Sequence, residues 1–168
     1  MAELTPRERL QPSLLDRLTD QHPQRQEESR DERVLSPRQL KASVIRDLQW
    51  LFNCCDLDSV QPLAAYPEVL SSVVNYGLPD LAGRNLSGID LLTLERELRQ
   101  AILRYEPRIL RQGLQIRVLL DDSQMSTNAI RFDIEGELWG NPMPQRLYLR
   151  TSLDLENGEV RVNDAAGR

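Results

Sequence analysis

The chain has 168 residues, with 21 Lys and Arg against 26 Asp and Glu, a formal net charge of −5 and 40% apolar composition. A chain of this length can form one domain that needs neither disulfide nor metal to fold. The acidic balance, with basic residues scattered singly, argues against an electrostatic grip on nucleic acid. We find no apolar run long enough for a membrane span or a signal-peptide core, so we expect a cytoplasmic protein.

The first predicted element is a short helix within an N-terminal arm, residues 1–20. A leucine cluster follows the potential N-cap Ser13, and its members are Leu14, Leu15 and Leu18. The next stretch is almost purely polar and cannot bury enough apolar surface to offset the entropy of ordering. We therefore predict a flexible charged linker over residues 21–34 that tethers the leucine cluster.

The folded domain is predicted to cover residues 35–163 and to begin with a helix. Ser36, Pro37 and Gln39 have the spacing of a capping box with proline at the first helical position. Apolar residues then recur at helical spacing and predict a helix from about Ser36 to Asn53 with one buried face. That face consists of Leu40, Val44, Leu48, Leu51 and Phe52.

Two adjacent cysteines, Cys54 and Cys55, come directly after this helix. A disulfide between neighbours would close almost no loop and would strain the peptide between them. The pair cannot complete a zinc site, because the single histidine, His22, lies far away in a polar stretch. We expect two reduced cysteines, with no metal and no cofactor.

Two further helices are predicted before the chain changes character. The first starts at Pro67, ends near Gly77, and has an apolar face formed by Val69, Leu70, Val73 and Val74. The second opens at Ser87 with Asp90 three residues later, and it closes before Pro107. Its apolar stripe consists of Leu91, Leu94, Leu98, Ala101, Ile102 and Tyr105.

The hydrophobic period then falls to two, which is typical of strands with one buried face. Three alternating runs lie within residues 114–120, 130–138 and 147–155. Asn157-Gly158 predicts a tight type I′ hairpin into a last strand at Val160–Val162. We predict an α+β fold in which N-terminal helices pack on a C-terminal four-stranded antiparallel meander sheet, with residues 164–168 as a disordered tail.

No group of residues predicts catalysis. Gly83 and Gly88 lack the lysine and the strand context of a phosphate-binding loop, and His22 offers no base to a nucleophile. Asp121-Asp122 could pair with Glu106 as acid and base, but nothing in the sequence fixes their separation. Four further carboxylates lie on alternating charged faces, for which solvated surface is the simplest interpretation: Glu95, Glu97, Glu135 and Glu137. We predict that the protein is not an enzyme.

Glu106-Pro107-Arg108 is the most unusual short segment, and two interpretations of it remain open. In the first, the guanidinium captures a carboxylate of a partner protein. In the second, Pro107 simply starts another short turn that Gly113 ends, and Glu106 favours the positive end of that turn.

The triplet after an amphipathic helix resembles a signature of small baseplate proteins from contractile tails. The segments that carry the resemblance are Leu14-Leu15-Asp16-Arg17-Leu18, Tyr66-Pro67-Glu68-Val69, the run from Asn75 to Leu81, Glu106-Pro107-Arg108, the run from Phe132 to Trp139 and the run from Leu149 to Leu155. This order resembles the sheath-initiator family, which is shared by bacteriophage wedges and the type VI secretion baseplate subunit TssE. Some members carry a lysozyme label, which the carboxylates of this chain do not support. The leucine element and the Asn-Tyr-Gly-Leu segment favour the secretion branch.

The resemblance implies a non-catalytic subunit, present as a monomer in each baseplate wedge, that starts polymerisation of the contractile sheath by strand exchange. It implies other wedge subunits (TssF, TssG and TssK) and sheath proteins (TssB and TssC) as partners. It implies neither nucleic-acid binding nor membrane insertion, and it implies a cytoplasmic location at the baseplate docked to the inner membrane. A soluble adaptor that binds a protease-delivery protein and an unrecognised carbohydrate hydrolase are the competing hypotheses.

Three groups of residues are candidates for partner binding. The tethered cluster contributes Leu14, Leu15, Arg17 and Leu18. By the resemblance, the triplet contributes Glu106, Pro107 and Arg108 as contacts to neighbouring wedge subunits. The last strand, with Val160, Arg161 and Val162, is the candidate sheet edge, because the unpaired backbone groups of an edge can bond to an arriving strand.

Overall fold

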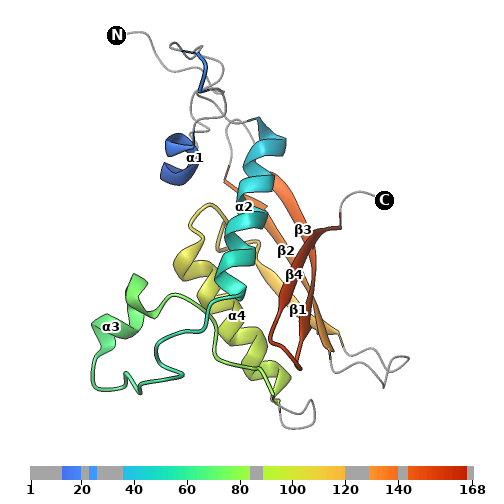
Figure 1. Ribbon diagram of the computed structural model, residues 1–168. Helices are drawn as coiled ribbons and strands as arrows, with labels where there is room; N and C mark the ends of the chain where they lie inside the picture. The colour runs from blue at the N-terminus through green and yellow to red at the C-terminus, as the bar shows by residue number, and fades with distance from the viewer. Residues whose placement is uncertain are drawn as a thin grey trace.

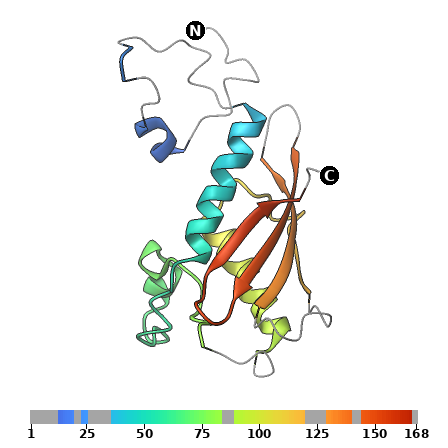
Figure 2. The same cartoon turned by 45° about the vertical axis from the view of Figure 1, so that its right-hand side comes forward.

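The computed structural model describes residues 13–19, 23–25, 36–83, 89–119, 129–139 and 144–165. Helices precede a four-stranded antiparallel sheet and cover one of its faces (Figure 1, Figure 2), so the predicted α+β fold class is confirmed. Several predictions lie outside the described residues, namely those on most of the linker 21–34, His22, Ser87, Gly88, Asp121, Asp122 and residues 166–168.

The helices are α1 (Leu14–Leu18), α2 (Pro37–Phe52), α3 (Pro67–Ser71), the 3₁₀ turn η2 (Val73–Asn75) and α4 (Leu91–Tyr105). The predicted capping box of α2 is present: the Ser36 side chain accepts from the Gln39 N–H, and the Gln39 side chain accepts from the Ser36 N–H. At α4 the N-cap is Asp90, whose side chain accepts from the Leu92 N–H. α2 buries the whole apolar face that its spacing predicts, whereas α4 buries the centre of its predicted stripe and leaves Leu91 and Tyr105 at its ends half-buried.

The single helix predicted from Pro67 to Gly77 is wrong in its second half. The helix breaks at Ser72, whose hydroxyl accepts from the Val74 N–H and caps η2 instead. Short hydroxyl side chains offer the backbone such local alternatives to a continuous helix. As a result Val73 and Val74, predicted on the buried face, are 79% and 63% exposed.

The strands are β1 (Gln115–Leu119), β2 (Ala129–Leu138), β3 (Gln145–Asp154) and β4 (Val160–Asp164). They follow one another across the sheet in chain order, and each pair is antiparallel, as the predicted meander requires. β1 and β4 are therefore the two edges. β4 runs on to Asp164, and the Ala165 N–H donates to the Tyr148 carbonyl at 3.0 Å, so the sheet extends slightly past the predicted domain end.

The type I′ turn predicted at Asn157-Gly158 is wrong. Asp154 and Glu159 close the connection through an N–H to carbonyl bond of 3.0 Å, so four residues lie between them. A type I′ turn needs positive φ at both central residues, but here only Gly158 has one, at +73°. Leu155 is fully buried, which lengthens the connection by drawing its first residue into the core.

One core joins α2, α4 and the apolar face of the sheet. The rings of Phe52 on α2 and Phe132 on β2 meet edge to face, with centroids 5.8 Å apart. α2 lies beside β4 and α4 beside β1, so each long helix borders one sheet edge (Figure 2).

Between α2 and α4 the chain makes an excursion, residues 56–76, whose two ends are joined. The Leu78 N–H donates to the Cys54 carbonyl and the Asp56 N–H donates to the Leu78 carbonyl, each at 2.9 Å. Figure 1 shows α3, inside this excursion, standing away from the sheet. Gly77 allows the junction to close, because its backbone passes directly against Cys54 and Asp56 with φ at +143°.

Candidate functional site

The Glu106-Pro107-Arg108 segment is held between the end of α4 and the end of β2. Glu106 is the C-cap of α4. Two backbone bonds then fasten the following residues to β2: the Trp139 N–H donates to the Arg108 carbonyl at 2.7 Å, and the Leu110 N–H donates to the Glu137 carbonyl at 2.8 Å. The position of the triplet is therefore set by the sheet as well as by the helix.

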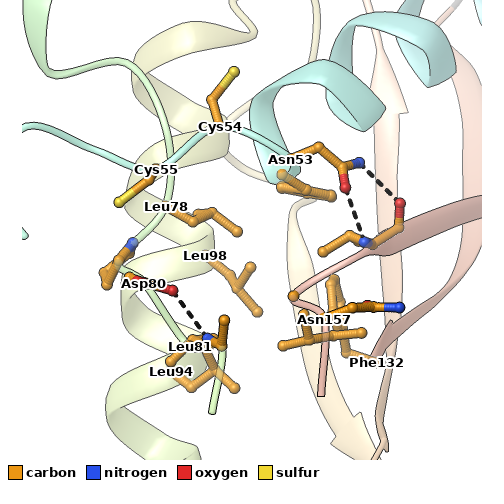
Figure 3. Close-up of a pocket in the computed structure, with 16 residues that line it drawn as sticks. Asn53, Cys54, Cys55, Leu78, Asp80, Leu81, Leu94, Leu98, Phe132 and Asn157 are labelled. Carbon is orange, nitrogen blue, oxygen red and sulfur yellow. Dashed lines mark hydrogen bonds between the residues drawn. The ribbon is translucent and has the colours of Figure 1, made fainter. Parts of the chain in front are cut away.

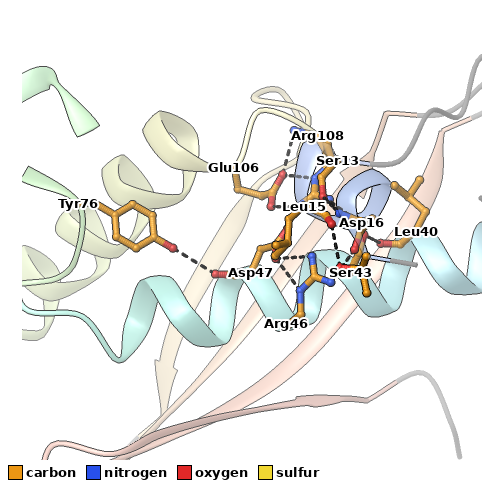
Figure 4. Close-up of polar contacts among 11 residues, drawn as sticks. Ser13, Leu15, Asp16, Leu40, Ser43, Arg46, Asp47, Tyr76, Glu106 and Arg108 are labelled. Carbon is orange, nitrogen blue, oxygen red and sulfur yellow. Dashed lines mark hydrogen bonds and ion pairs between the residues drawn. The ribbon is translucent and has the colours of Figure 1, made fainter. Parts of the chain in front are cut away.

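The side chains of Glu106 and Arg108 bond to each other (Figure 4). The Glu106 side chain is 4% exposed, and its carboxylate accepts from Arg108 Nε at 2.6 Å and from Arg108 Nη2 at 2.5 Å. This is a bidentate, charge-assisted pair, the strongest common geometry for these two groups. The guanidinium is therefore bonded within the chain, which neither interpretation of the triplet included, and the predicted contact with wedge neighbours stays a prediction.

The same guanidinium continues the network onto α2. Arg108 Nη2 lies 2.5 Å from the Asp47 carboxylate, and Arg108 Nη1 donates to the Ser43 hydroxyl at 3.1 Å. The other Asp47 carboxylate oxygen accepts from Arg46 Nε at 2.9 Å. One guanidinium thus ties the end of α4 to the centre of α2.

α1 joins the network through Asp16. Arg46 Nη1 lies 2.5 Å from an Asp16 carboxylate oxygen, and the Ser13 hydroxyl donates to the other oxygen at 2.6 Å. α1, the predicted tethered helix, therefore contacts α2 through the ion pair between Asp16 and Arg46. Its leucines remain outside: Leu14 is 71% exposed, Leu15 44% and Leu18 74%.

Burial and charge shift several pKa values in this network. Burial alone would lower the pKa of Arg108, but the Glu106 and Asp47 carboxylates outweigh it and raise that pKa above its ordinary value. Burial raises the pKa of Asp16, yet Arg46 and Ser13 together hold it below the usual carboxyl value. Burial, assisted by nearby negative groups, raises the pKa of Tyr76 to about 12. At physiological pH Arg108 and Asp16 are therefore charged, whereas the Tyr76 hydroxyl keeps its proton.

The structure brings together two of the three predicted groups of site residues. The leucine cluster on α1 and the triplet after α4 meet through α2, whereas Val160, Arg161 and Val162 lie on β4. Sequence reasoning missed Ser43, Arg46 and Asp47, which link the two groups. The available signal was Ser43, a hydroxyl placed directly before Val44 on the otherwise apolar face of α2.

The edge strand β4 is partly covered from within the chain. The Asn53 side-chain amide donates to the Val160 carbonyl, and its oxygen accepts from the Val160 N–H, both at 2.9 Å (Figure 3). Backbone groups alternate in direction along a strand, so Val162 also points away from β3, whereas Arg161 points toward it. No described residue bonds to the Val162 backbone, and Lys41 pairs with Asp164 at the far end.

A small cavity of about 160 Å³ lies beside this edge, and Figure 3 shows its lining. Its walls include Cys54, Leu78, Leu98 and Phe132. Cys54 and Cys55 point in different directions from the backbone. Among the residues that the structure describes, no cluster of three potential metal ligands occurs.

Replacing Asp16 with asparagine is expected to release α1 from α2, because the neutral amide cannot keep the charge-assisted contact with Arg46. Since both side chains are partly exposed, the loss should be about 0.5–1 kcal/mol in the docking free energy of α1. Faster amide hydrogen exchange at Arg17 and Thr19, whose N–H groups bond within α1, would report it. Unchanged exchange at both amides would show that α1 is held by other contacts.

Acidification should have the same effect in the unsubstituted chain. The pKa of Asp16 is lower in the folded state, so this contribution is complete above the ordinary carboxyl pKa of about 3.9 and is lost as the pH falls below it.

No described helix has the length and apolar character needed to cross a membrane.

Comparison with known proteins adds one finding. The sequence matches the family described as baseplate wedge protein gp25 over residues 38–143, which is more than half of the chain. The matched region runs from α2 past the end of β2 and includes the Glu106-Pro107-Arg108 segment. No curated protein matches the chain.

Proposed function

Because the chain belongs to the gp25 family of baseplate wedge proteins, we propose that it is the TssE-type subunit of a type VI secretion baseplate and starts polymerisation of the contractile sheath. The family gives the coarser role, a structural component of a phage-tail-like baseplate. In the finer role, an extended arm of a sheath protein adds as a further strand to the edge of β4.

The outward-facing backbone of Val162 is the observation that carries this proposal. Strand addition needs an N–H and a carbonyl that point away from the sheet, and Val162 supplies both without a partner in the described part of the chain. Asn53 occupies the same two groups of Val160. An arriving arm would therefore pair at Val162 first and displace the Asn53 amide to extend its ladder.

The remaining partner contacts would use α1. Leu14, Leu15 and Leu18 expose apolar side chains together on one short helix, and exposed apolar patches mark protein contacts. We assign them to wedge subunits of the TssF, TssG and TssK kind, and the β4 edge to sheath proteins of the TssB and TssC kind. This division keeps residues 1–20 as an arm, 21–34 as a linker and 35–163 as the domain that the sheath meets.

Replacing Val162 with proline is expected to stop sheath growth from purified baseplates supplied with sheath proteins. Proline removes the outward N–H and leaves the β3–β4 ladder intact, because that ladder uses the neighbouring Arg161. Proline at Arg161 would instead break the ladder to β3, because the Arg161 N–H points toward that strand. Sheath length and number, counted by electron microscopy, would measure the effect.

The matched control is Val162→Ala, which shortens the buried side chain but keeps the N–H. It should lower stability by about 1–2 kcal/mol and leave sheath growth intact. Normal growth from baseplates that carry Val162→Pro would contradict strand addition at β4, whereas failure of both variants would assign the effect to folding and remove the support for an edge contact.

A further inference from the structure

The second sheet edge, β1, is bordered by charged side chains of α4. The Glu95 carboxylate accepts from the Val118 N–H at 2.8 Å, and Arg99 Nε donates to the Leu114 carbonyl at 3.4 Å. Both backbone groups therefore point away from β2, and alternation along the strand gives Ile116 the same direction. No described residue bonds to the N–H or the carbonyl of Ile116 on that side.

A groove of about 330 Å³ lies along this edge, between α4 and β1. Its lining consists of Glu95, Arg96, Arg99, Leu114, Gln115, Ile116 and Arg117. Three arginines and one glutamate give the groove an excess of positive charge, although the chain as a whole has a net charge of −5. The groove is thus positive on a chain that is acidic overall.

The three guanidinium groups have neutral hydrogen-bond partners in the described part of the chain, and the Asp90 carboxylate acts on Arg96 through its charge alone. Arg96 donates to the Leu92 carbonyl and the Thr93 hydroxyl. Arg99 donates to the carbonyls of Leu114 and Arg111, each at 3.4 Å, and Arg117 donates to the side-chain oxygen of Gln115 at 3.2 Å. The bonds of Arg99 are long and go to neutral oxygens, which leaves its guanidinium able to take a carboxylate, its strongest partner.

We propose that the groove between α4 and β1 binds an extended, carboxylate-bearing segment of a partner protein. The segment pairs with the N–H and carbonyl of Ile116 as an added strand, and its carboxylate lies on Arg99. Glu95 sets the register, because its negative charge repels an acidic side chain at the Val118 end of the groove. This site is separate from the β4 edge and goes beyond the proposed sheath contact.

The combination of a sheet edge and arginines identifies the occupant as protein. A strand supplies the alternating donors and acceptors that the Ile116 backbone requires, which a phosphate chain lacks. A carboxylate matches the planar fork of Arg99. The groove therefore differs in chemistry from the β4 edge, where the neutral amide of Asn53 borders the open backbone.

A labelled nine-residue peptide, with valine and threonine alternating around a central aspartate, tests the proposal on the full chain by fluorescence anisotropy. We expect this peptide to bind at least about tenfold more tightly than the same peptide with a central lysine. In the chain, Arg99→Glu should weaken the aspartate peptide by about tenfold and strengthen the lysine peptide. The matched control is Arg38→Glu, an exposed arginine on α2 that should leave both affinities unchanged.

Amide hydrogen exchange locates the peptide. Slower exchange at Ile116 with bound aspartate peptide supports the groove, and this readout does not depend on whether β4 receives the sheath. Equal affinity for the two peptides, no binding of either, or slower exchange at Val162 in place of Ile116 would overturn the proposal. Failure of sheath growth in the Val162→Pro experiment leaves each of these measurements unaffected.

Discussion

Replacing Arg108 with alanine is expected to lower the free energy of unfolding by about 2–4 kcal/mol. The substitution leaves the Glu106 carboxylate buried and without its bidentate partner, and it removes the ion pair with Asp47. Breaking a fully buried pair costs about 3–5 kcal/mol, and we expect less here because Asp47 and Arg108 are each roughly a fifth exposed. Urea denaturation at neutral pH would measure the change.

Arg161→Ala is the control for this experiment. The Arg161 side chain is 67% exposed and its ion pair is with nearby Glu159, so its loss should leave the free energy of unfolding nearly unchanged. A small effect of Arg108→Ala, combined with loss of baseplate assembly, would contradict the structural role and return the guanidinium to partner capture.

Replacing Gly77 with alanine is expected to have an effect of similar size, about 2–5 kcal/mol. An added Cβ would lie 2.5 Å from the Cys54 carbonyl oxygen and 2.7 Å from the Asp56 nitrogen, and both are backbone atoms that cannot move aside separately. The φ of +143° adds strain for any side chain. We expect the junction between Cys54 and Leu78 to open, with faster amide exchange at Leu78.

Gly83→Ala separates the backbone strain from the steric contact. Gly83 also has a positive φ, +73°, but nothing lies within 4 Å of its added Cβ. The substitution should therefore cost only the conformational term, about 1–2 kcal/mol. If both variants lost the same stability, the close approach at Gly77 would not be the reason for a glycine there.

Much of the fold follows from local sequence signals. The capping box at Ser36 and the apolar spacing that follows it define α2, because both depend on residues only three or four positions apart. The strands of the sheet follow from alternation, since Phe132 and Ile134 on β2 are buried as their period requires. Such signals need no knowledge of distant contacts.

The two wrong predictions, of a helix and of a turn, concern segments whose conformation depends on tertiary contacts. Val74 follows a helical period, but Ser72 breaks the helix and Asn75 is buried in its place, bonded to the Asp58 N–H and the Leu70 carbonyl. Asn157-Gly158 has the composition of a type I′ turn, but burial of Leu155 lengthens the connection.

The sequence predicted only part of the candidate site, because some of its residues lie far apart along the chain. Glu106 and Arg108 stand out as a pair, yet their third partner, Asp47, lies 61 positions from Arg108. No local pattern links residues so far apart, and α2 offers many charged positions of which only a few face the triplet. The three-dimensional packing of α2 against the end of α4 selects Asp47 and Ser43.

The junction between Cys54 and Leu78 makes residues 56–76 an appendage that leaves and re-enters the domain at one place. Its length is thereby uncoupled from the geometry of the sheet. A longer or shorter appendage would therefore leave the strands and their register in place, and the contacts that it makes with Arg104 and Tyr105 of α4 are the ones that would change.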